Sequence, residues 1–429
     1  MKKRNWHRCR HPDRLAMIGI APIVPIVTLV ALLLVTGACG PTTDKGNDTG
    51  SNDAPDESKF DRGSGKDKDK HHGGETANAD GPNSDAPKDD KAGSDADNRK
   101  GAHGHDQPKT AAKWYITMHG EPSGNTVHAL SGEGETLGNI LDEVPKSAGG
   151  DAKGVRGMLH TGEHGLMVVS ANMDDTRLLR YGPPGTDGML PFESVFAQKA
   201  LKDPDLVHSY AIAVGADGTV YTSNQDTNTV SAYKGIGTAT PGQPVPVPAE
   251  ISGLGIPAGT IVPRAQVSPQ GITEIRGIAI GADGLLYVCD RGASQVVVFD
   301  PQTGLRKSVL ADASNGLKHP IQLLFAPDGE TVYLTDNGVP AIFRIDTKTG
   351  NIILFANTQT GCPPLPSSLA MDNEHLYVGD RKKKQIIRFK LTNGESDNKP
   401  FASDLPDAPE FMVPASPQPF IPPVKSAGP

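Results

Sequence analysis

A short unit that recurs along the chain governs which folds this sequence can adopt. Each copy consists of a small apolar strand, a turn centred on Asp-Gly or an equivalent, and a second apolar strand ending in Asp or Asn. The copies span residues 156–172, 210–224, 276–290, 321–336 and 368–380. Two apolar strands joined by an Asp-Gly turn are typical of a β-hairpin. The sequence therefore predicts five hairpins in series.

A third and a fourth strand follow the hairpins, so each unit contains four strands. Short fourth strands are predicted at 192–197, 305–311, 351–356 and 398–402. The hairpin-ending residues Asp290, Asp336 and Asp380 lie 46 and 44 positions apart. A period of about 40–50 residues with four strands is typical of a blade of a β-propeller. A Pro- and Gly-rich insertion at 238–263 lengthens one unit.

A sixth unit is split between the two ends of the repeat region. Residues 114–120 align with a second strand and 124–134 with a third, but no innermost strand precedes them. The stretch PEFMV at 409–413 can supply it. We therefore predict an all-β fold: a six-bladed β-propeller of four-stranded antiparallel blades over 113–413, closed by the C-terminal strand. Closure also protects the sheet edges.

The N-terminal segment, residues 1–38, predicts export. Residues 1–14 carry six Lys or Arg and one Asp, and residues 15–38 are uncharged, as in a secretory signal. Gly37 and Ala38 directly before Cys39 resemble the lipobox of bacterial lipoproteins, which implies a lipid such as palmitate on Cys39. A retained transmembrane segment is the alternative, because the uncharged run is long enough to span a bilayer. Both interpretations place the rest of the chain on the extracytoplasmic face of the cell membrane.

Residues 39–112 are predicted to form a disordered charged linker. Residues 41–112 contain 16 Asp or Glu, 11 Lys or Arg, and Phe60 as the only large apolar side chain, too little to offset chain entropy. A Pro-rich tail is predicted at 414–429. The net charge is −8, and because the first 14 residues carry +5, the remainder is acidic. That balance excludes the electrostatic pattern of nucleic-acid binding.

The repeat, with its small apolar strand, Asp-Gly turn and LYV-x-D ending, resembles NHL and YVTN repeats. It is also similar to the gluconolactonase/luciferin-regenerating-enzyme family of six-bladed propellers. The latter resemblance implies a divalent cation in the central channel, held by carboxylates and an Asn at the starts of innermost strands. The matching entrance positions here are Arg156, His208, Arg276, His319 and Ser367, with Glu274 and Glu410 nearby. This set is basic, so no cofactor is firmly predicted and a divalent metal stays open.

Two functional hypotheses follow. The first is a binding module on a membrane-anchored, monomeric lipoprotein, which takes an unknown protein or small-molecule ligand through Arg156, His208, Arg276 and His319. The second is a lactonase-like hydrolase or a lyase acting in the channel, with His208, Glu274, Arg276 and His319 as candidate catalytic residues. Similarity to streptogramin-lyase propellers, which use His residues in a comparable place, implies acid or base roles for His208 and His319.

Other residues have structural interpretations. The Asp or Asn at positions 172, 224, 290, 336 and 380 is expected to accept backbone N–H bonds in every blade. The HTGEH string at 160–164 matches a zinc-peptidase motif, but it aligns with a hairpin turn. The basic run 381–384 is expected to be a solvated turn. Cys289 and Cys362 form a disulfide or remain two unpaired thiols.

Overall fold

The computed structural model describes residues 111–120, 125–161, 165–200, 205–264, 271–397 and 399–416. The predicted signal segment, Cys39, almost all of the predicted linker and the tail from residue 417 lie outside these residues, as do Glu163 and His164 of the HTGEH string. In the described residues, all helices are short 3-10 turns, and none is long and apolar enough to cross a membrane.

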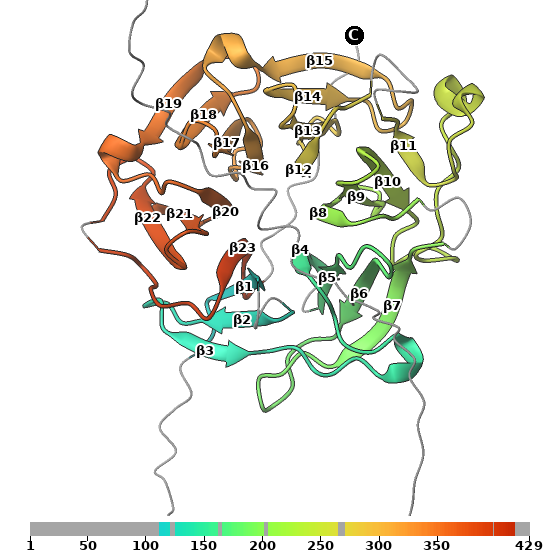
Figure 1. Ribbon diagram of the computed structural model, residues 1–429, viewed down its shortest axis with the longest axis horizontal. Coiled ribbons are helices and arrows are strands. Elements are labelled where there is room, and N and C mark those ends of the chain that lie inside the picture. The colour runs from blue at the N-terminus through green and yellow to red at the C-terminus, as the bar shows by residue number, and fades with distance from the viewer. Residues whose placement is uncertain are drawn as a thin grey trace, which may run out of the picture. The chain divides into compact units, whose positions relative to one another are not determined.

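Six antiparallel sheets form the ring predicted from the repeat (Figure 1). From the innermost strand outward, the ring-closing blade contains β23 (Ala408–Pro414), β1 (Trp114–His119), β2 (Val127–Leu130) and β3 (Thr136–Asn139). The second contains β4 (Val155–Thr161), β5 (Gly165–Ser170), β6 (Arg177–Tyr181) and β7 (Phe192–Gln198). The third contains β8 (Ser209–Val214), β9 (Val220–Asn224), β10 (Thr229–Tyr233) and β11 (Thr260–Val262).

The remaining blades continue the ring. The fourth contains β12 (Ile275–Ile280), β13 (Leu286–Asp290), β14 (Gln295–Phe299) and β15 (Arg306–Ala311). The fifth contains β16 (Pro320–Phe325), β17 (Thr331–Asp336), β18 (Ala341–Asp346) and β19 (Ile352–Asn357). The sixth contains β20 (Pro366–Met371), β21 (His375–Asp380) and β22 (Gln385–Lys390). The 3-10 helices between strands are η2 (Lys146–Ala148), η3 (Ala249–Leu254), η4 (Ala313–Asn315) and η5 (Thr358–Thr360).

The hairpin turns form because of their Asp-Gly pairs. Gly284 has a φ of 76°, in the left-handed region that favours glycine. The Oδ1 atom of Asp283 accepts the backbone N–H of Leu285 at 3.0 Å, and Oδ2 accepts the Tyr287 hydroxyl at 2.9 Å. Asp217 and Asp328 accept N–H groups two residues on in the same way. The short polar turn thus directs both strands back along one another.

Apolar side chains hold neighbouring blades together. Six clusters of buried residues join adjacent blades, for example Val230 and Val262 of the third blade with Val288 of the fourth. Near the axis the innermost strands approach so closely that only glycine fits. A Cβ added at Gly277 would lie 2.7 Å from the carbonyl oxygen of Ile321. The core is therefore a ring of interfaces between blades.

The predicted ring closure is confirmed. Strand β23 pairs antiparallel with β1, in a register that runs from Trp114 opposite Pro414 to His119 opposite Ala408. The backbone N–H of Ala415 donates to the Lys113 carbonyl at 2.7 Å, so the pairing extends past the strand ends. The two ends of the repeat region therefore share one blade.

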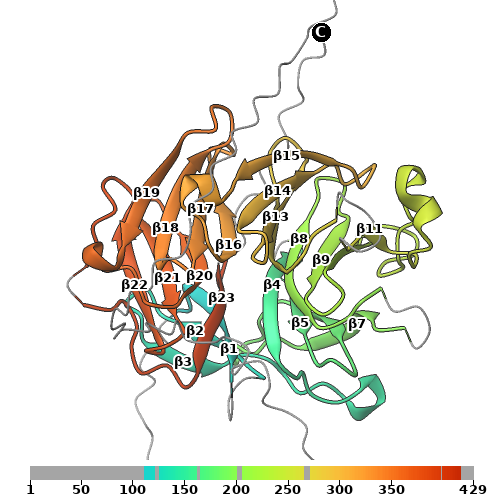
Figure 2. The same ribbon diagram turned by 45° about the horizontal axis from the view of Figure 1, so that its top comes forward.

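The structure corrects two details of the strand prediction. In the sixth blade the described residues of the stretch 398–402 form no fourth strand; instead, single bridges join Ala402 to Ile386 and Ser396 to Phe389. In the second blade the strand end is Ser170 rather than Asn172, because Ser170 pairs with Val155. The third blade's insertion carries η3, which projects from the outside of the ring (Figure 2).

Of the two alternatives for Cys289 and Cys362, the structure shows no disulfide: both are free and buried. Cys289 lies in β13, in the cluster between the fourth and fifth blades, whereas Cys362 lies in the cluster between the fifth and sixth. Because a blade separates these clusters, the alternative of two unpaired thiols describes the structure. Burial raises the pKa of Cys289 well above its usual range and that of Cys362 to about 12, so both thiols are unreactive.

Candidate functional site

The predicted site residues lie where the innermost strands begin. Arg156, Arg276, Ser367 and Glu410 follow the first or second residue of β4, β12, β20 and β23, and Tyr210 takes the same place in β8. His208, Glu274 and His319 immediately precede their strands. All eight therefore lie at one end of the ring, around its axis. We call the face formed there the axial face.

A buried carboxylate joins three blades at the axial face. Arg156 Nη1 lies 3.2 Å from Glu410 Oε1, and Arg381 Nε lies 3.1 Å from Glu410 Oε2. The Glu410 side chain is 0% exposed. Burial alone would raise its pKa, but the charges of Arg381, Arg156 and His119 outweigh this and hold the pKa below its ordinary value. Glu410 is thus an ionised group that links the ring-closing blade to the second and sixth blades.

His208 extends this network. Its Nε2 atom lies 3.5 Å from Arg156 Nη2, and its Nδ1 atom lies 2.9 Å from Asp226 Oδ1. The residue has a φ of 48°, a left-handed conformation that is strained for a side chain other than glycine. This backbone conformation places the imidazole ring between the guanidinium of Arg156 and the carboxylate of Asp226. Because Arg156 can only donate, it occupies the Nε2 lone pair when the ring is neutral.

A second network lies on the fourth blade. Glu274 Oε1 is 3.1 Å from Arg276 Nη2 and 2.6 Å from Arg291 Nη1. The Glu274 side chain is 38% exposed, unlike Glu410. Beside it, burial and the charge of Arg291 lower the pKa of His319. His319 therefore belongs to this second network and is not joined to His208 by any hydrogen bond in the described part of the chain.

Tyr210 connects the two networks. Its ring lies 5.4 Å from the Arg156 guanidinium carbon and 5.7 Å from that of Arg276, which is the distance of a cation–π contact. The residue is buried, and burial together with the nearby Glu410 charge raises its pKa well above the usual range. The neutral tyrosine thus holds two arginines close together in an enclosed setting.

The two networks are rich in arginine. Four guanidinium groups, from Arg156, Arg276, Arg291 and Arg381, contact the carboxylates of Glu274 and Glu410. Asp226 contributes a further carboxylate at the edge, where its side chain is 43% exposed. Arginines bind carboxylate and phosphate groups through paired hydrogen bonds. The axial face can therefore attract and orient an anionic group.

The remaining predicted residues have structural roles. Ser367 donates its hydroxyl to the Pro409 carbonyl at 2.7 Å and so fixes β23 against the sixth blade. Asp290, Asp336 and Asp380 are fully buried and accept backbone N–H groups, as the structural interpretation predicted. Among the described residues, no group of three or more His, Cys, Asp or Glu side chains is placed to hold a metal ion.

Sequence reasoning missed four members of the axial face: Tyr210, Asp226, Arg291 and Arg381. A signal for two of them exists, because Arg291 and Arg381 each follow the Asp that ends a hairpin. Alignment of the repeats on that Asp places both arginines in one column. The expectation that the run 381–384 is a solvated turn holds for Lys382 and Lys383, which are exposed, but is wrong for Arg381, which pairs with Glu410.

Together, the ring of blades and the charged axial face define a six-bladed β-propeller with its polar cluster at the axis. Within it, residues 273–299 match the NHL repeat and cover the hairpin and third strand of the fourth blade. The similarity to NHL repeats inferred from the sequence is thereby confirmed. No curated protein matches the chain.

Two solved structures are among those that the chain matches. A chain of the crystal structure of a nidogen/laminin complex has a TM-score of 0.51 at 14% identity, and the match covers 72% of this chain and all of that one. The computationally designed Ika8 protein has a TM-score of 0.37 at 13% identity, with 67% of this chain and 74% of that chain covered. At 14% identity, the likeness to the chain of the nidogen/laminin complex concerns the fold alone.

Proposed function

We propose that the propeller is a binding module whose axial face takes up an acidic segment of a partner protein. The observation that carries this proposal is the gathering of four guanidinium groups at that face. Arginine is enriched at the centres of protein interfaces, where it forms paired hydrogen bonds to carboxylates. The NHL repeat and the likeness to a propeller found in a nidogen/laminin complex support a protein partner.

Hexaglutamate provides a probe for this face. It should bind the full chain in isothermal titration calorimetry, and its affinity should fall as salt is added, because the interaction is electrostatic. Arg276→Gln and Arg291→Gln should each weaken binding about fivefold, since one partly exposed charged contact contributes about 1 kcal/mol. Both side chains lie at the half-exposed Glu274, so the fold should tolerate the changes.

Lys307→Gln is the matched control. Lys307 lies on β15, the outermost strand of the same blade, and is exposed. Its loss should leave hexaglutamate binding unchanged. Equal weakening in all three variants, or binding that is indifferent to salt, would contradict the proposal that the axial face is the binding site.

We also propose that the chain is a lipoprotein held at the outer side of the cell membrane through Cys39. The support is the sequence pattern of basic residues, an uncharged run and a small-residue pair before this cysteine. Cys39→Ala should abolish labelling with radioactive palmitate and release the protein from the membrane fraction. Cys9→Ala, which changes a cysteine in the basic segment, should label like the unaltered protein. Undiminished labelling of Cys39→Ala would exclude this anchor.

A second candidate function is a hydrolase or lyase acting at the same face. One observation favours it: the contact of Asp226 with His208 Nδ1, which orients an imidazole as in many acid–base sites. Turnover of a lactone or ester that is lost in His208→Gln would favour this candidate. Binding of hexaglutamate without such turnover favours the binding module.

A further inference from the structure

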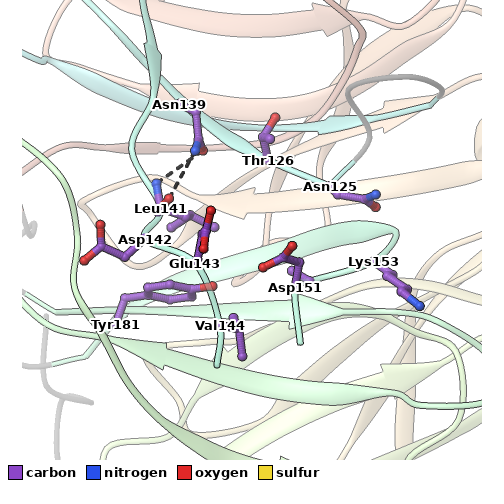
Figure 3. A pocket seen from close by; sticks show the side chains of 11 residues that line it. Asn125, Thr126, Asn139, Leu141, Asp142, Glu143, Val144, Asp151, Lys153 and Tyr181 are labelled. Carbon is purple, nitrogen blue, oxygen red and sulfur yellow. Dashed lines mark hydrogen bonds between the residues drawn. The ribbon is translucent and has the colours of Figure 1, made fainter. Parts of the chain in front are cut away.

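A pocket of about 390 Å³ lies away from the axis, between the ring-closing blade and the second blade. The segment that links β3 to β4, including Asp142, Glu143 and Asp151, forms much of its lining, and Tyr181 of β6 contributes from the second blade (Figure 3). A volume of this size lies near the lower end of the range of small-molecule sites, about 300–1,000 Å³. The pocket has no part in the axial face.

The pocket is acidic. Asp142, Glu143 and Asp151 supply three carboxylates, and Lys153 is the one basic side chain in the lining. In the part of the chain that the structure describes, none of these carboxylates forms a side-chain hydrogen bond or an ion pair. Figure 3 shows the Lys153 ammonium directed away from Asp151 at one side of the pocket. Two negative charges are therefore uncompensated.

The Tyr181 hydroxyl gives an independent indication of a ligand. The residue is 1% exposed, and its ring packs edge-on against Phe192 with the centroids 5.9 Å apart. Figure 3 shows the hydroxyl pointing into the pocket, yet it has no hydrogen-bond partner among the described residues. Burial raises its pKa, Arg177 opposes this, and the charges of Asp151 and Asp142 add to the rise, so the hydroxyl stays neutral. The hydroxyl is therefore available to form a hydrogen bond with a group that enters the pocket.

The lining segment is held in place. The Arg177 side chain, 1% exposed, donates from Nη1 to the carbonyls of Ala148 and Gly150 at 2.7 and 3.0 Å, and from Nη2 to that of Asp151 at 3.1 Å. At the other end, the Asp142 N–H donates to the Leu190 carbonyl at 3.1 Å. The carboxylates therefore project from a fixed loop, which lowers the entropy cost of binding.

The lining distinguishes between kinds of cation. Among the described residues, the three carboxylates are not placed together to hold a metal ion. They can instead accept hydrogen bonds from a larger cation that has several N–H donors. Leu141, Val144 and Ala152 are buried and form an apolar part of the lining. We infer that this pocket binds an ammonium or guanidinium group carried on an aliphatic stem, whether a free amine or a Lys or Arg side chain. The carboxylates and the Tyr181 hydroxyl accept its N–H groups, and the apolar residues contact the stem.

The experiment uses the full chain and calorimetric titration with cadaverine, with 1-pentanol as a neutral probe of similar length. Cadaverine should bind and pentanol should not. Glu143→Gln should weaken cadaverine binding about tenfold, because it removes a charged acceptor. Glu133→Gln, which removes an exposed carboxylate of the neighbouring loop, is the matched control and should bind like the unaltered protein.

Tyr181→Phe keeps the packing against Phe192 and removes only the hydroxyl without a partner. It should unfold at the same temperature or higher, and cadaverine should bind about fivefold more weakly. Comparison of cadaverine with N-acetyl-lysine methylamide assigns the source: tighter binding of the lysine derivative indicates a protein side chain, and tighter binding of cadaverine a free amine. Failure of both to bind, equal binding of pentanol, or displacement of cadaverine by equimolar Ca²⁺ would overturn the inference.

Discussion

A chain that ends at Asp407 is expected to lose cooperative folding. The deletion removes β23, the strand that pairs with β1 on the inner side of the ring-closing blade. It also removes Met412 from the cluster between this blade and the sixth, and leaves Arg156 and Arg381 without their shared carboxylate. These losses together exceed the roughly 5–15 kcal/mol by which domains are stable. Urea unfolding followed by circular dichroism should show no transition.

A chain that ends at Ser416 is the control for this deletion. It retains β23 and the hydrogen bond from Ala415 to Lys113, and should unfold at the same urea concentration as the full chain. A cooperative transition of normal midpoint in the shorter chain would show that the ring does not need its last strand.

Glu410→Gln is expected to cost about 3–5 kcal/mol of stability, the penalty for removing one partner of a buried ion pair. Glu274→Gln is the matched control, since Glu274 also bridges two arginines but is 38% exposed. It should cost about 1 kcal/mol or less. Urea unfolding at pH 7 measures both costs. Equal costs in the two variants would contradict the assignment of Glu410 as a buried ionic link.

The cost of Glu410→Gln should depend on pH. Because the pKa of Glu410 is lowered in the folded protein, the ionised group stabilises the fold above the ordinary glutamate value of 4.5. This contribution is lost as the pH falls through the folded-state pKa. The difference in unfolding free energy between the unaltered chain and the variant should therefore shrink below pH 4.5.

Much of the fold could be predicted because each blade repeats the same local chemistry. The Asp-Gly turns and the alternation of apolar strands specify hairpins without any long-range information. The ring closure followed from counting, since the unit at 114–134 lacked one strand and 409–413 offered it. The absence of a fourth strand from the described residues 399–402 could not be predicted, because strand pairing there depends on tertiary packing, and within this stretch only the bridge from Ala402 to Ile386 forms.

The site was predicted only in part. Arg156, His208, Arg276 and Glu410 were found because strand starts face the axis in any propeller. Their pairing was not, because which arginine meets Glu410 depends on blades some 250 residues apart in sequence, as the Arg156–Glu410 contact shows. The acidic pocket gave no sequence signal, since Asp142, Glu143 and Asp151 lie in a link between repeats.

The closure of the ring has a mechanical consequence. Strand β1 lies between β2 and β23, and antiparallel hydrogen bonds run perpendicular to the strands they join. A pull on the chain ahead of Lys113 acts along β1, so it loads both ladders in shear and their bonds must fail together. In an open ring, the place where the two ends of the repeat region meet would be the weakest point. Here the pairing of β1 with β2 and β23 makes this place resist force applied through the N-terminal part of the chain.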